Sequence, residues 1–582
     1  MKDFFKTTLA VIAGLVVVIV LTIMIGAGVV GALMSAGNGT PVIPESGVLS
    51  IDMSKVTIAE QSQEDDPLSM LSGEGSASTI GLWDAVQAIH TAASDPAVKY
   101  IYLKTDGSAT DISSIEEFRK ALKNFREQSG KAIVSYIESP TTASYYLASV
   151  SDKIYMTSYQ GAMASITGVG SQMIFLGDLL DRLGVNMQLV RHGKYKSAGE
   201  MYTRNSSSAE NRAQNQRLVD SLWETISKEI ANSREISVEE LNAAIDGLKL
   251  NLPQDFIDHK LVDELMTRQQ LQDQLAVLAV EEDFDDVRMI PFADYVSARA
   301  AKTKIGGDEI AVIYANGEII DGKSKDNIAG DRFAGLIAKV RADSTVKAVV
   351  LRVNSPGGSV LASEKIKHEL DLLQEVKPVV ASYGSYAASG GYWISNNCDK
   401  IYSDATTLTG SIGVFSLVPD LSKTMKNIAH VNIESVTSNK HGDMLSGMRP
   451  FDSAEYAYMQ RSVETIYELF TKLVSEGRDM PVETVDAIAQ GRVWTGADGL
   501  VINLVDEIGS LEDAVKHAAA LAGDADITNW NIGSYPRPQN QMDKILSLFG
   551  GAMDEEEVML ERLKEISTPK ILARMDTHFE IK

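Results

Sequence analysis

Cysteine is almost absent from this chain of 582 residues, which has only Cys398. A single cysteine excludes an intrachain disulfide and a cysteine-rich zinc site. Positive charge is also scarce, because 54 lysines and arginines are outnumbered by 79 aspartates and glutamates, for a net charge of −25. This surplus argues against nucleic acid as a partner, since phosphate backbones require a basic surface. It also disfavours broad contact with anionic lipid.

Charged residues are missing from residues 7–44, and residues 9–34 are almost wholly apolar. A bilayer core needs about 20 apolar residues in a helix, whereas the apolar core of a signal peptide has about 7–15. We therefore predict a transmembrane anchor, although residues 32–36 could also serve as a signal-peptide cleavage site. Lys2 and Lys6 favour a cytoplasmic N-terminus, which would place the rest of the chain outside the cytoplasm.

The chain is too long for one core, because domains usually have about 50–250 residues. Three segments recur in the same order with nearly the same offset: residues 95–103 as 343–351, residues 152–155 as 399–402, and residues 261–265 as 504–508. A repeat of this length indicates two domains of one fold rather than a solenoid. The sequence therefore predicts an internal duplication.

Apolar runs at residues 98–103 and 132–136 predict buried strands, with a helix between them. The second half repeats the alternation, with a strand at 348–353, a helix at 362–375 and a strand at 379–382. Alternating strands and helices indicate parallel pairing and an α/β fold.

From these patterns we predict four regions. They are a cytoplasmic stub, transmembrane anchor and linker at residues 1–44, an N-terminal domain at 45–305, a C-terminal domain at 306–545, and a charged amphipathic extension at 546–582.

Ser389 precedes two glycines and an apolar stretch. A serine that begins a helix there would be open to a substrate and close to free backbone N–H groups; the alternative is a simple N-cap. Residues 354–358 form an Asn-Ser-Pro-Gly-Gly turn after a predicted strand. Glycines let a backbone approach a ligand, and the N–H groups of such a turn can stabilise an oxyanion. Both motifs would meet at the carboxyl ends of adjacent parallel strands, unless residues 354–358 form only a tight turn.

A nucleophilic serine needs a base. His192, His430 and His441 lie in the broad neighbourhood, but none belongs to a Gly-x-Ser-x-Gly elbow or a familiar triad spacing. A lysine can serve if burial lowers its pKa towards neutrality. Lys196 stands among small and neutral residues and is the candidate, with a solvated side chain as the alternative.

Four segments together resemble the signal peptide peptidase A family, also called protease IV, in its long, two-domain, membrane-anchored form. They are residues 195–198, 354–358, 384–395 and 409–414. The resemblance spans nearly the whole chain. It implies a Ser–Lys protease on two tandem Clp/crotonase-like α/β domains, with Ser389 as the nucleophile and Lys196 as the general base.

The resemblance also implies the supporting groups. Ser411 would orient the lysine, the N–H groups of Gly358 and Gly390 would form the oxyanion hole, and Gly357 would shape the turn. No cofactor and no metal is implied. The expected partners are cleaved signal peptides and other short or unfolded chains, the expected assembly is a homotetramer, and the expected location is the bacterial inner membrane, with a single pass and the catalytic domains on the periplasmic side.

The duplication adds an argument from the residues. Aligning residues 152–155 on 399–402 puts Thr142 opposite Ser389, and residues 105–108 stand where the second copy has its Pro-Gly-Gly turn. Each copy would thus keep one half of a single site. Two alternatives remain: a catalytically inactive scaffold for membrane quality control, and acyl-CoA chemistry on the related crotonase fold.

Overall fold

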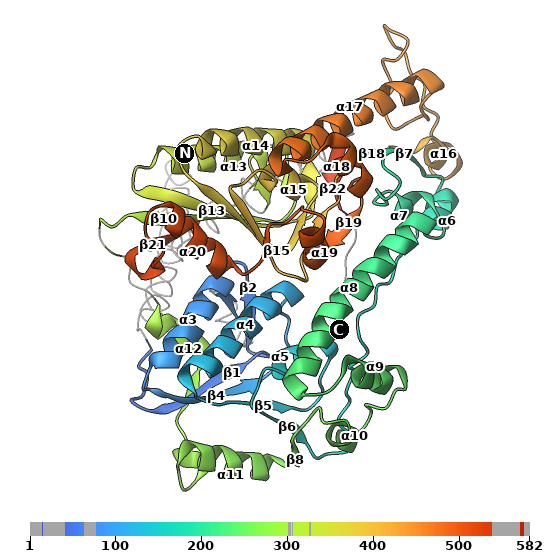
Figure 1. Cartoon of the computed structure of the whole chain (residues 1–582). Coiled ribbons are helices and arrows are strands. Elements are labelled where there is room, and N and C mark those ends of the chain that lie inside the picture. The colour runs from blue at the N-terminus through green and yellow to red at the C-terminus, as the bar shows by residue number, and fades with distance from the viewer. Residues whose placement is uncertain are drawn as a thin grey trace, which may run out of the picture.

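The structure is a computed structural model that describes residue 14 and residues 41–62, 77–300, 304, 306–324, 327–537 and 571–575. It has two parallel sheets, each packed with helices, one below the other in Figure 1. The predicted α/β class is therefore confirmed. Within these residues no helix has the length and apolarity to cross a bilayer. The predicted anchor at residues 9–34 lies outside the described residues, apart from Gly14.

The lower sheet in Figure 1 is built from the first half of the chain. Its strand order is β8-β6-β5-β4-β1-β9, and every pair is parallel. The central strands are largely buried because helices cover a parallel sheet on both faces. The strands are β1 (Gly47–Asp52), β4 (Val98–Lys104), β5 (Ile133–Ile137), β6 (Lys153–Thr157), β8 (Glu264–Met266) and β9 (Met289–Pro291).

The second half of the chain forms an upper sheet with the same strand order. Its path β20-β16-β15-β13-β10-β21 matches the first sheet strand for strand. Its strands are β10 (Glu309–Asn316), β13 (Val346–Ser355), β15 (Val379–Ala388), β16 (Lys400–Ser403), β20 (Glu507–Ile508) and β21 (Asn531–Tyr535). Two short strands, β17 (Leu408–Gly410) and β19 (Val493–Thr495), extend it beside the far end of β15.

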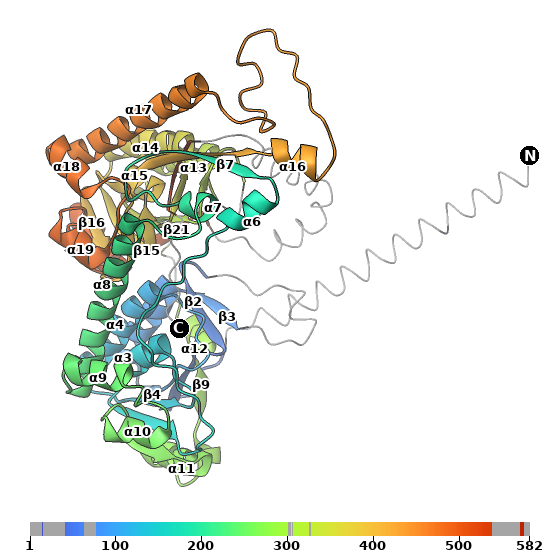
Figure 2. The same ribbon diagram turned by 90° about the vertical axis from the view of Figure 1, so that its right-hand side faces the viewer.

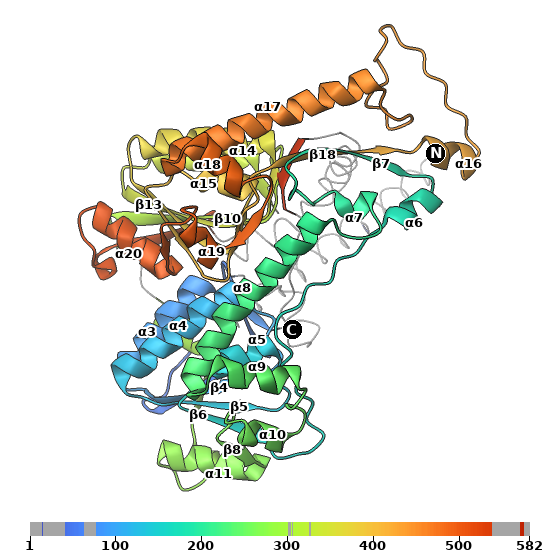
Figure 3. The same ribbon diagram turned by 45° about the vertical axis from the view of Figure 1, so that its right-hand side comes forward.

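Corresponding helices recur in the two halves. The pairs are α3 (Leu82–Ser94) with α13 (Gly330–Ala342), α4 (Ile112–Ser129) with α14 (Val360–Gln374), α5 (Thr142–Ala148) with α15 (Gly390–Ser395), and α8 (Ala209–Arg234) with α17 (Ser453–Arg478). Figure 3 shows α8 rising from the first half towards α19 (Gly496–Val501) of the second, and α8 contacts β19. There the Ser221 and Thr495 hydroxyls are 2.7 Å apart, and Gln214 Oε1 accepts from Val493 N at 2.8 Å.

A third sheet joins the halves. Its order is β12-β11-β14-β22-β18-β7, so it combines strands of both halves with one from the C-terminus. The strands are β7 (Asn186–His192), β11 (Ile319–Ile320), β12 (Ile328–Ala329), β14 (Gly357–Ser359), β18 (Val414–Asp420) and β22 (Ile571–Arg574). β7 pairs antiparallel with β18, with His192 opposite Val414, and Figure 2 shows β7 lying across the second half. This pairing places the segment after β7 against the second half.

The remaining elements are short or peripheral. They are β2 (Val56–Ala59), β3 (Ser78–Gly81), α6 (Gly177–Arg182), α7 (Glu200–Thr203), α9 (Val238–Asp246), α10 (Pro253–Asp258), α11 (Arg268–Ala279), α12 (Phe292–Arg299), α16 (Ser422–Asn427), α18 (Val482–Ile488), α19 (Gly496–Val501) and α20 (Leu511–Leu521).

A buried cluster of charged side chains lies where the two halves pack together. Arg352 of β13 is 1% exposed and contacts Glu60 at 2.7 Å and Glu117 at 2.8 Å. Asp404, which follows β16, is 3% exposed and interacts electrostatically with Glu117 and Arg352. One guanidinium of the second half therefore holds two carboxyl groups of the first half.

The cluster contains more carboxyls than Arg352 alone can neutralise. Burial, reinforced by Glu117 and Glu116, raises the pKa of Asp404 well above its ordinary value. Burial also raises the pKa values of Glu60, Glu116 and Glu117. The folded chain therefore retains a proton at Asp404 that the unfolded chain releases above its ordinary pKa of about 4.

We predict that Asp404→Asn weakens the pH dependence of stability. The proton on Asp404 stabilises the folded state fully below pH about 4, and this contribution is lost as pH rises towards the raised pKa. The wild type should lose up to about 1.4 kcal/mol of unfolding free energy per pH unit through this one group, and the amide variant should not. The measurement is the melting temperature between pH 5 and pH 8. Exposed Asp246→Asn is the control for loss of one negative charge, and equal slopes for wild type and Asp404→Asn would contradict the prediction.

Candidate active site

Ser389 lies at the tight junction between β15 and α15. Its φ of 55° and ψ of −112° are unusual for a residue with a side chain, and such strain gathers at functional sites. The side chain makes no capping bond to α15. The simple N-cap interpretation is therefore wrong, and the hydroxyl has another partner.

That partner is Lys196. Its Nζ lies 2.9 Å from Ser389 Oγ, 3.0 Å from Ser411 Oγ and 3.1 Å from the Ser411 carbonyl oxygen. The exposed fractions are 2% for Lys196, 0% for Ser389 and 1% for Ser411. Burial disfavours the charged form of an amine, so this setting suits a lysine that has to accept a proton.

A second layer of contacts fixes the backbone around Lys196. Arg191 Nη1 donates to the Lys196 carbonyl at 2.7 Å and to Glu200 at 3.2 Å. Burial raises the pKa of Glu200, but hydrogen bonds from Ser208 and Arg191 more than offset it and leave this pKa below its usual value. Glu200 therefore remains an anionic anchor for Arg191 and, through it, for the lysine loop.

Gly491 is a site residue that the sequence analysis missed. It has a φ of 78°, and a Cβ placed on it would lie 2.5 Å from Lys196 Cβ and 2.6 Å from Lys196 Cα and N. Only a glycine lets the lysine segment approach so closely. The sequence carries no signal for this, since nothing in it shows that residues 196 and 491 meet.

The Pro-Gly-Gly turn lies against the start of α15, as expected. A Cβ built on Gly357 would lie 2.6 Å from the backbone nitrogen of Gly390, and one built on Gly390 would lie 3.1 Å from that of Gly358. The φ of Gly357 is 96°, which only glycine adopts without strain. The turn thus brings the Gly358 and Gly390 backbone nitrogens together beside Ser389.

The other candidate residues have different surroundings. His192 stacks on Tyr467 with ring centroids 3.9 Å apart, His441 bonds to Glu455 at 2.7 Å, and His430 lies in the exposed loop after α16. Thr142, which the sequence alignment sets opposite Ser389, accepts a hydrogen bond from Thr167 N at 3.2 Å. The group that donates to Ser389 Oγ in the described residues is the lysine, as the resemblance implied.

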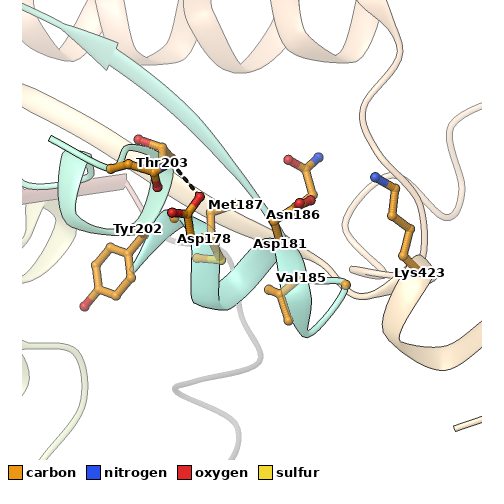
Figure 4. A pocket seen from close by; sticks show the side chains of 11 residues that line it. Asp178, Asp181, Val185, Asn186, Met187, Tyr202, Thr203 and Lys423 are labelled. Atoms are coloured by element: carbon orange, nitrogen blue, oxygen red, sulfur yellow. Dashed lines mark hydrogen bonds between the residues drawn. The ribbon is translucent and has the colours of Figure 1, made fainter. Parts of the chain in front are cut away.

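A pocket also lies away from the Ser389 site. It has a volume of 320 Å³, and its lining includes Asp178, Asp181, Asn186, Tyr202 and Lys423. Figure 4 shows these side chains around the end of β7 that begins at Asn186. Lys196 follows the opposite end of that strand, about 20 Å away at about 3.3 Å per residue. This pocket is therefore separate from the Ser389 site.

A buried serine bonded to a buried lysine, beside a glycine turn with converging backbone nitrogens, is the arrangement of a serine hydrolase. The sequence comparisons agree. The model of peptidase family S49 matches residues 125–281 and 371–524. The chain belongs to this family, that of signal peptide peptidase A or protease 4, and it is a serine protease.

Relatives cover most of the chain. Protease 4 of Salmonella typhi is 35% identical over 90% of this chain and 86% of its own length. Protease 4 of Haemophilus influenzae is 34% identical over 84% of this chain and 81% of its own length. The chloroplastic serine protease SPPA of Arabidopsis thaliana is 31% identical over 83% of this chain and 72% of its own length. The match therefore includes both halves.

We predict that Gly491→Ala lowers kcat/KM by about 100-fold. The added methyl group would push Lys196 away from Ser389, and a displacement of about 1 Å can cost about that much. The measurement is hydrolysis of a short fluorogenic peptide by the folded variant. Gly130→Ala is the matched control, because Gly130 has a similar φ of 67° but nothing within 4 Å of a built Cβ. If both variants kept wild-type kinetics, the packing of Lys196 against Gly491 would be irrelevant to activity.

Proposed function

We propose that this chain is a membrane-anchored endopeptidase that uses Ser389 as its nucleophile and Lys196 as its general base. The observation that carries the proposal is the 2.9 Å hydrogen bond from Lys196 Nζ to Ser389 Oγ between two buried side chains.

The reaction follows from this geometry. Ser389 Oγ attacks the peptide carbonyl carbon while its proton moves to neutral Lys196 Nζ, and the proton then passes to the leaving amine as the C–N bond breaks. Water hydrolyses the resulting acyl-enzyme with the same lysine as base. Ser411, 3.0 Å from Nζ, holds the lysine in place throughout.

The negative charge that develops on the peptide carbonyl oxygen needs hydrogen-bond donors that are already in position. The N–H groups of Gly358 and Gly390 are the proposed oxyanion hole, with Gly357 making the turn that lets them converge. Removing one such donor from a serine protease costs about 2.7–4 kcal/mol of transition-state stabilisation.

We further propose that the halves are duplicated Clp/crotonase-like domains, at residues 45–305 and 306–545. Their identical strand order supports this, as do the sequence segments that recur between them. Lys196 comes from the first and Ser389 from the second, so one working site would need both domains. The first copy would have lost its nucleophile at Thr142.

The proposed location is the inner membrane of a bacterium, with residues 1–44 as stub, anchor and linker and with both domains on the periplasmic side. The uncharged residues 7–44 support the anchor. The proposed substrates are cleaved signal peptides and other short or unfolded chains, and the proposed assembly is a homotetramer. Family membership supports both.

The central prediction concerns the Ser–Lys pair. Ser389→Ala and Lys196→Met should each lower kcat by about 10⁴-fold or more, and the double variant should be no slower than either one, because the two groups act as a unit. The measurement is peptide hydrolysis with folding checked by circular dichroism. Labelling of Ser389 by a fluorophosphonate should be lost in both variants.

Lys194→Met is the matched control for the loss of a lysine, since Lys194 is exposed and lies two residues away. In the control and the wild type, kcat/KM should rise with pH as the base loses its proton. Near-normal turnover by folded Ser389→Ala or Lys196→Met would refute the proposed chemistry. A folded wild type in which the fluorophosphonate never labels Ser389 would also refute it, and would favour the inactive scaffold.

A further prediction concerns the anchor. The full-length chain should stay with membranes after alkaline carbonate washing, because about 20 apolar helical residues suffice to span the bilayer. A variant lacking residues 1–40 should be released and should keep its peptidase activity. The measurement is fractionation followed by immunoblotting. Release of the full-length chain by carbonate would contradict an integral anchor.

A further inference from the structure

The turn formed by residues 490–492, between α18 and β19, is bonded to both loops of the candidate active site. Its first carbonyl accepts from Tyr195 N at 2.9 Å, and its last carbonyl accepts from Ser411 N at 2.7 Å. Between them, its middle N–H donates to the Ile412 carbonyl at 2.7 Å. One short segment therefore ties the residue before Lys196 to the serine that bonds the lysine amine.

The same turn covers Lys196. A Cβ built on Gly413 would lie 2.6 Å from Gly491 Cα and 3.2 Å from Lys196 Cδ, so the three residues are in close contact. A cavity whose lining includes Lys196, Ser411 and Gly491 has a volume of only 10 Å³, which is space for about one water molecule. A shift of the turn would therefore move the lysine and admit water to it.

Gln490 has a backbone conformation that is unusual for a residue with a side chain. Its φ is 55°, in the left-handed region that such residues seldom adopt. A Cβ built on Gly193 would lie 2.5 Å from the carbonyl carbon and oxygen of Gln490, so the lysine loop approaches this backbone directly. A conformation of this kind persists only where its surroundings hold it.

The side chain and the backbone N–H of Gln490 are held by one aspartate and one tyrosine. Nε2 donates to Asp486 Oδ1 at 2.6 Å and to Tyr467 Oη at 3.3 Å, and Gln490 N donates to the same Oη at 3.2 Å. Tyr467 Oη in turn donates to Asp486 Oδ1 at 2.5 Å. Burial and this hydrogen bond raise the pKa of Tyr467, so its hydroxyl keeps the proton that it donates.

Tyr467 links this network to the strand that precedes the lysine. Its ring is 4% exposed and stacks on His192, with centroids 3.9 Å apart and an interplanar angle of 22°. His192 ends β7, four residues before Lys196. A residue that only ended α18 would need a bond to that helix, where Asp486 lies, but it would not need contacts with α17 and with the lysine loop.

We propose that Gln490 is a positioning residue for Lys196. Held by Tyr467 and Asp486, it fixes the turn that keeps the lysine amine within hydrogen-bond distance of its two serine partners. This proposal rests on the function proposed above. It adds to the Ser–Lys pair a residue that acts through the backbone and takes no part in proton transfer.

The test compares side chains that keep or lose these hydrogen bonds, with hydrolysis of a short fluorogenic peptide as the measurement. Gln490→Met has nearly the same size but no amide, and it should lower kcat by about 10- to 100-fold, because a displacement of about 1 Å can cost the larger factor. KM should stay within about twofold of the wild type, since the lost contacts act on the base and not on the bound peptide. Tyr467→Phe should behave in the same way.

Asp486 offers a pair of variants that separates hydrogen bonding from charge. Asp486→Asn keeps an oxygen that can accept both bonds, so its kcat should stay within about threefold of the wild type. Asp486→Leu is of similar size and accepts no hydrogen bond, so it should be as slow as Gln490→Met. If Asp486 served only the stability of the fold, kcat per folded molecule would be the same in both variants.

Gln269→Met is the matched control. Gln269 bonds to an aspartate four residues away at 2.8 Å, as Gln490 does, but it lies on the exposed surface of α11. Its replacement should leave kcat and KM unchanged. Circular dichroism gives the folded fraction of each variant, so that kcat is compared per folded molecule.

Wild-type kcat in Gln490→Met, or equal kcat in Asp486→Asn and Asp486→Leu, would overturn the proposal. If Gln490→Met does not fold, the two Asp486 variants decide. If Ser389→Ala is inactive while either of those results is obtained, the inference about Gln490 fails and the proposed protease stands. An active Ser389→Ala would instead refute the proposed function itself.

Discussion

The hydrogen bond between Lys196 Nζ and Ser389 Oγ is the contact on which the arrangement of this molecule depends. Its two residues are 193 positions apart and belong to different halves. For a lysine to meet a serine in this way, β7 has to cross onto the second half and pair with β18, and Gly491 has to leave room for the lysine backbone. The geometry of two side chains therefore constrains how two whole domains pack.

Two kinds of contact between the halves stand out. Near the site they are main-chain ladders and close approaches at glycines, which fix positions and carry no charge. Farther away they are the buried carboxyls around Arg352, supplied by Glu60, Glu117 and Asp404. Removing one partner from such a buried cluster usually costs about 3–5 kcal/mol. The halves are thus held in register by shape at the active site and by paired charges behind it.

The sequence predicted the parts of this structure that depend on local pattern. Apolar runs such as residues 98–103 lie in strands, and the glycine turn and Ser389 lie at neighbouring strand ends, because parallel strands bring their carboxyl ends together. The pairing of Ser389 with Lys196 came from the resemblance to a family, since no periodicity links positions so far apart. Gly491 and β22 were missed for the same reason. Their roles arise from contacts made in three dimensions, and residues 571–575 have no local feature that distinguishes a strand of the third sheet from an amphipathic tail.

The separation of Lys196 from Ser389 along the chain also has a consequence in time. At about 5–20 residues per second, a ribosome that has finished Lys196 needs about 10–40 s to reach Ser389, and the strands that close the second sheet come later still. In the proposed mechanism, a nascent first half carries the base without the nucleophile, and the second half gains its base only when the two cores dock. Under that mechanism, docking of the two halves would itself complete the active site.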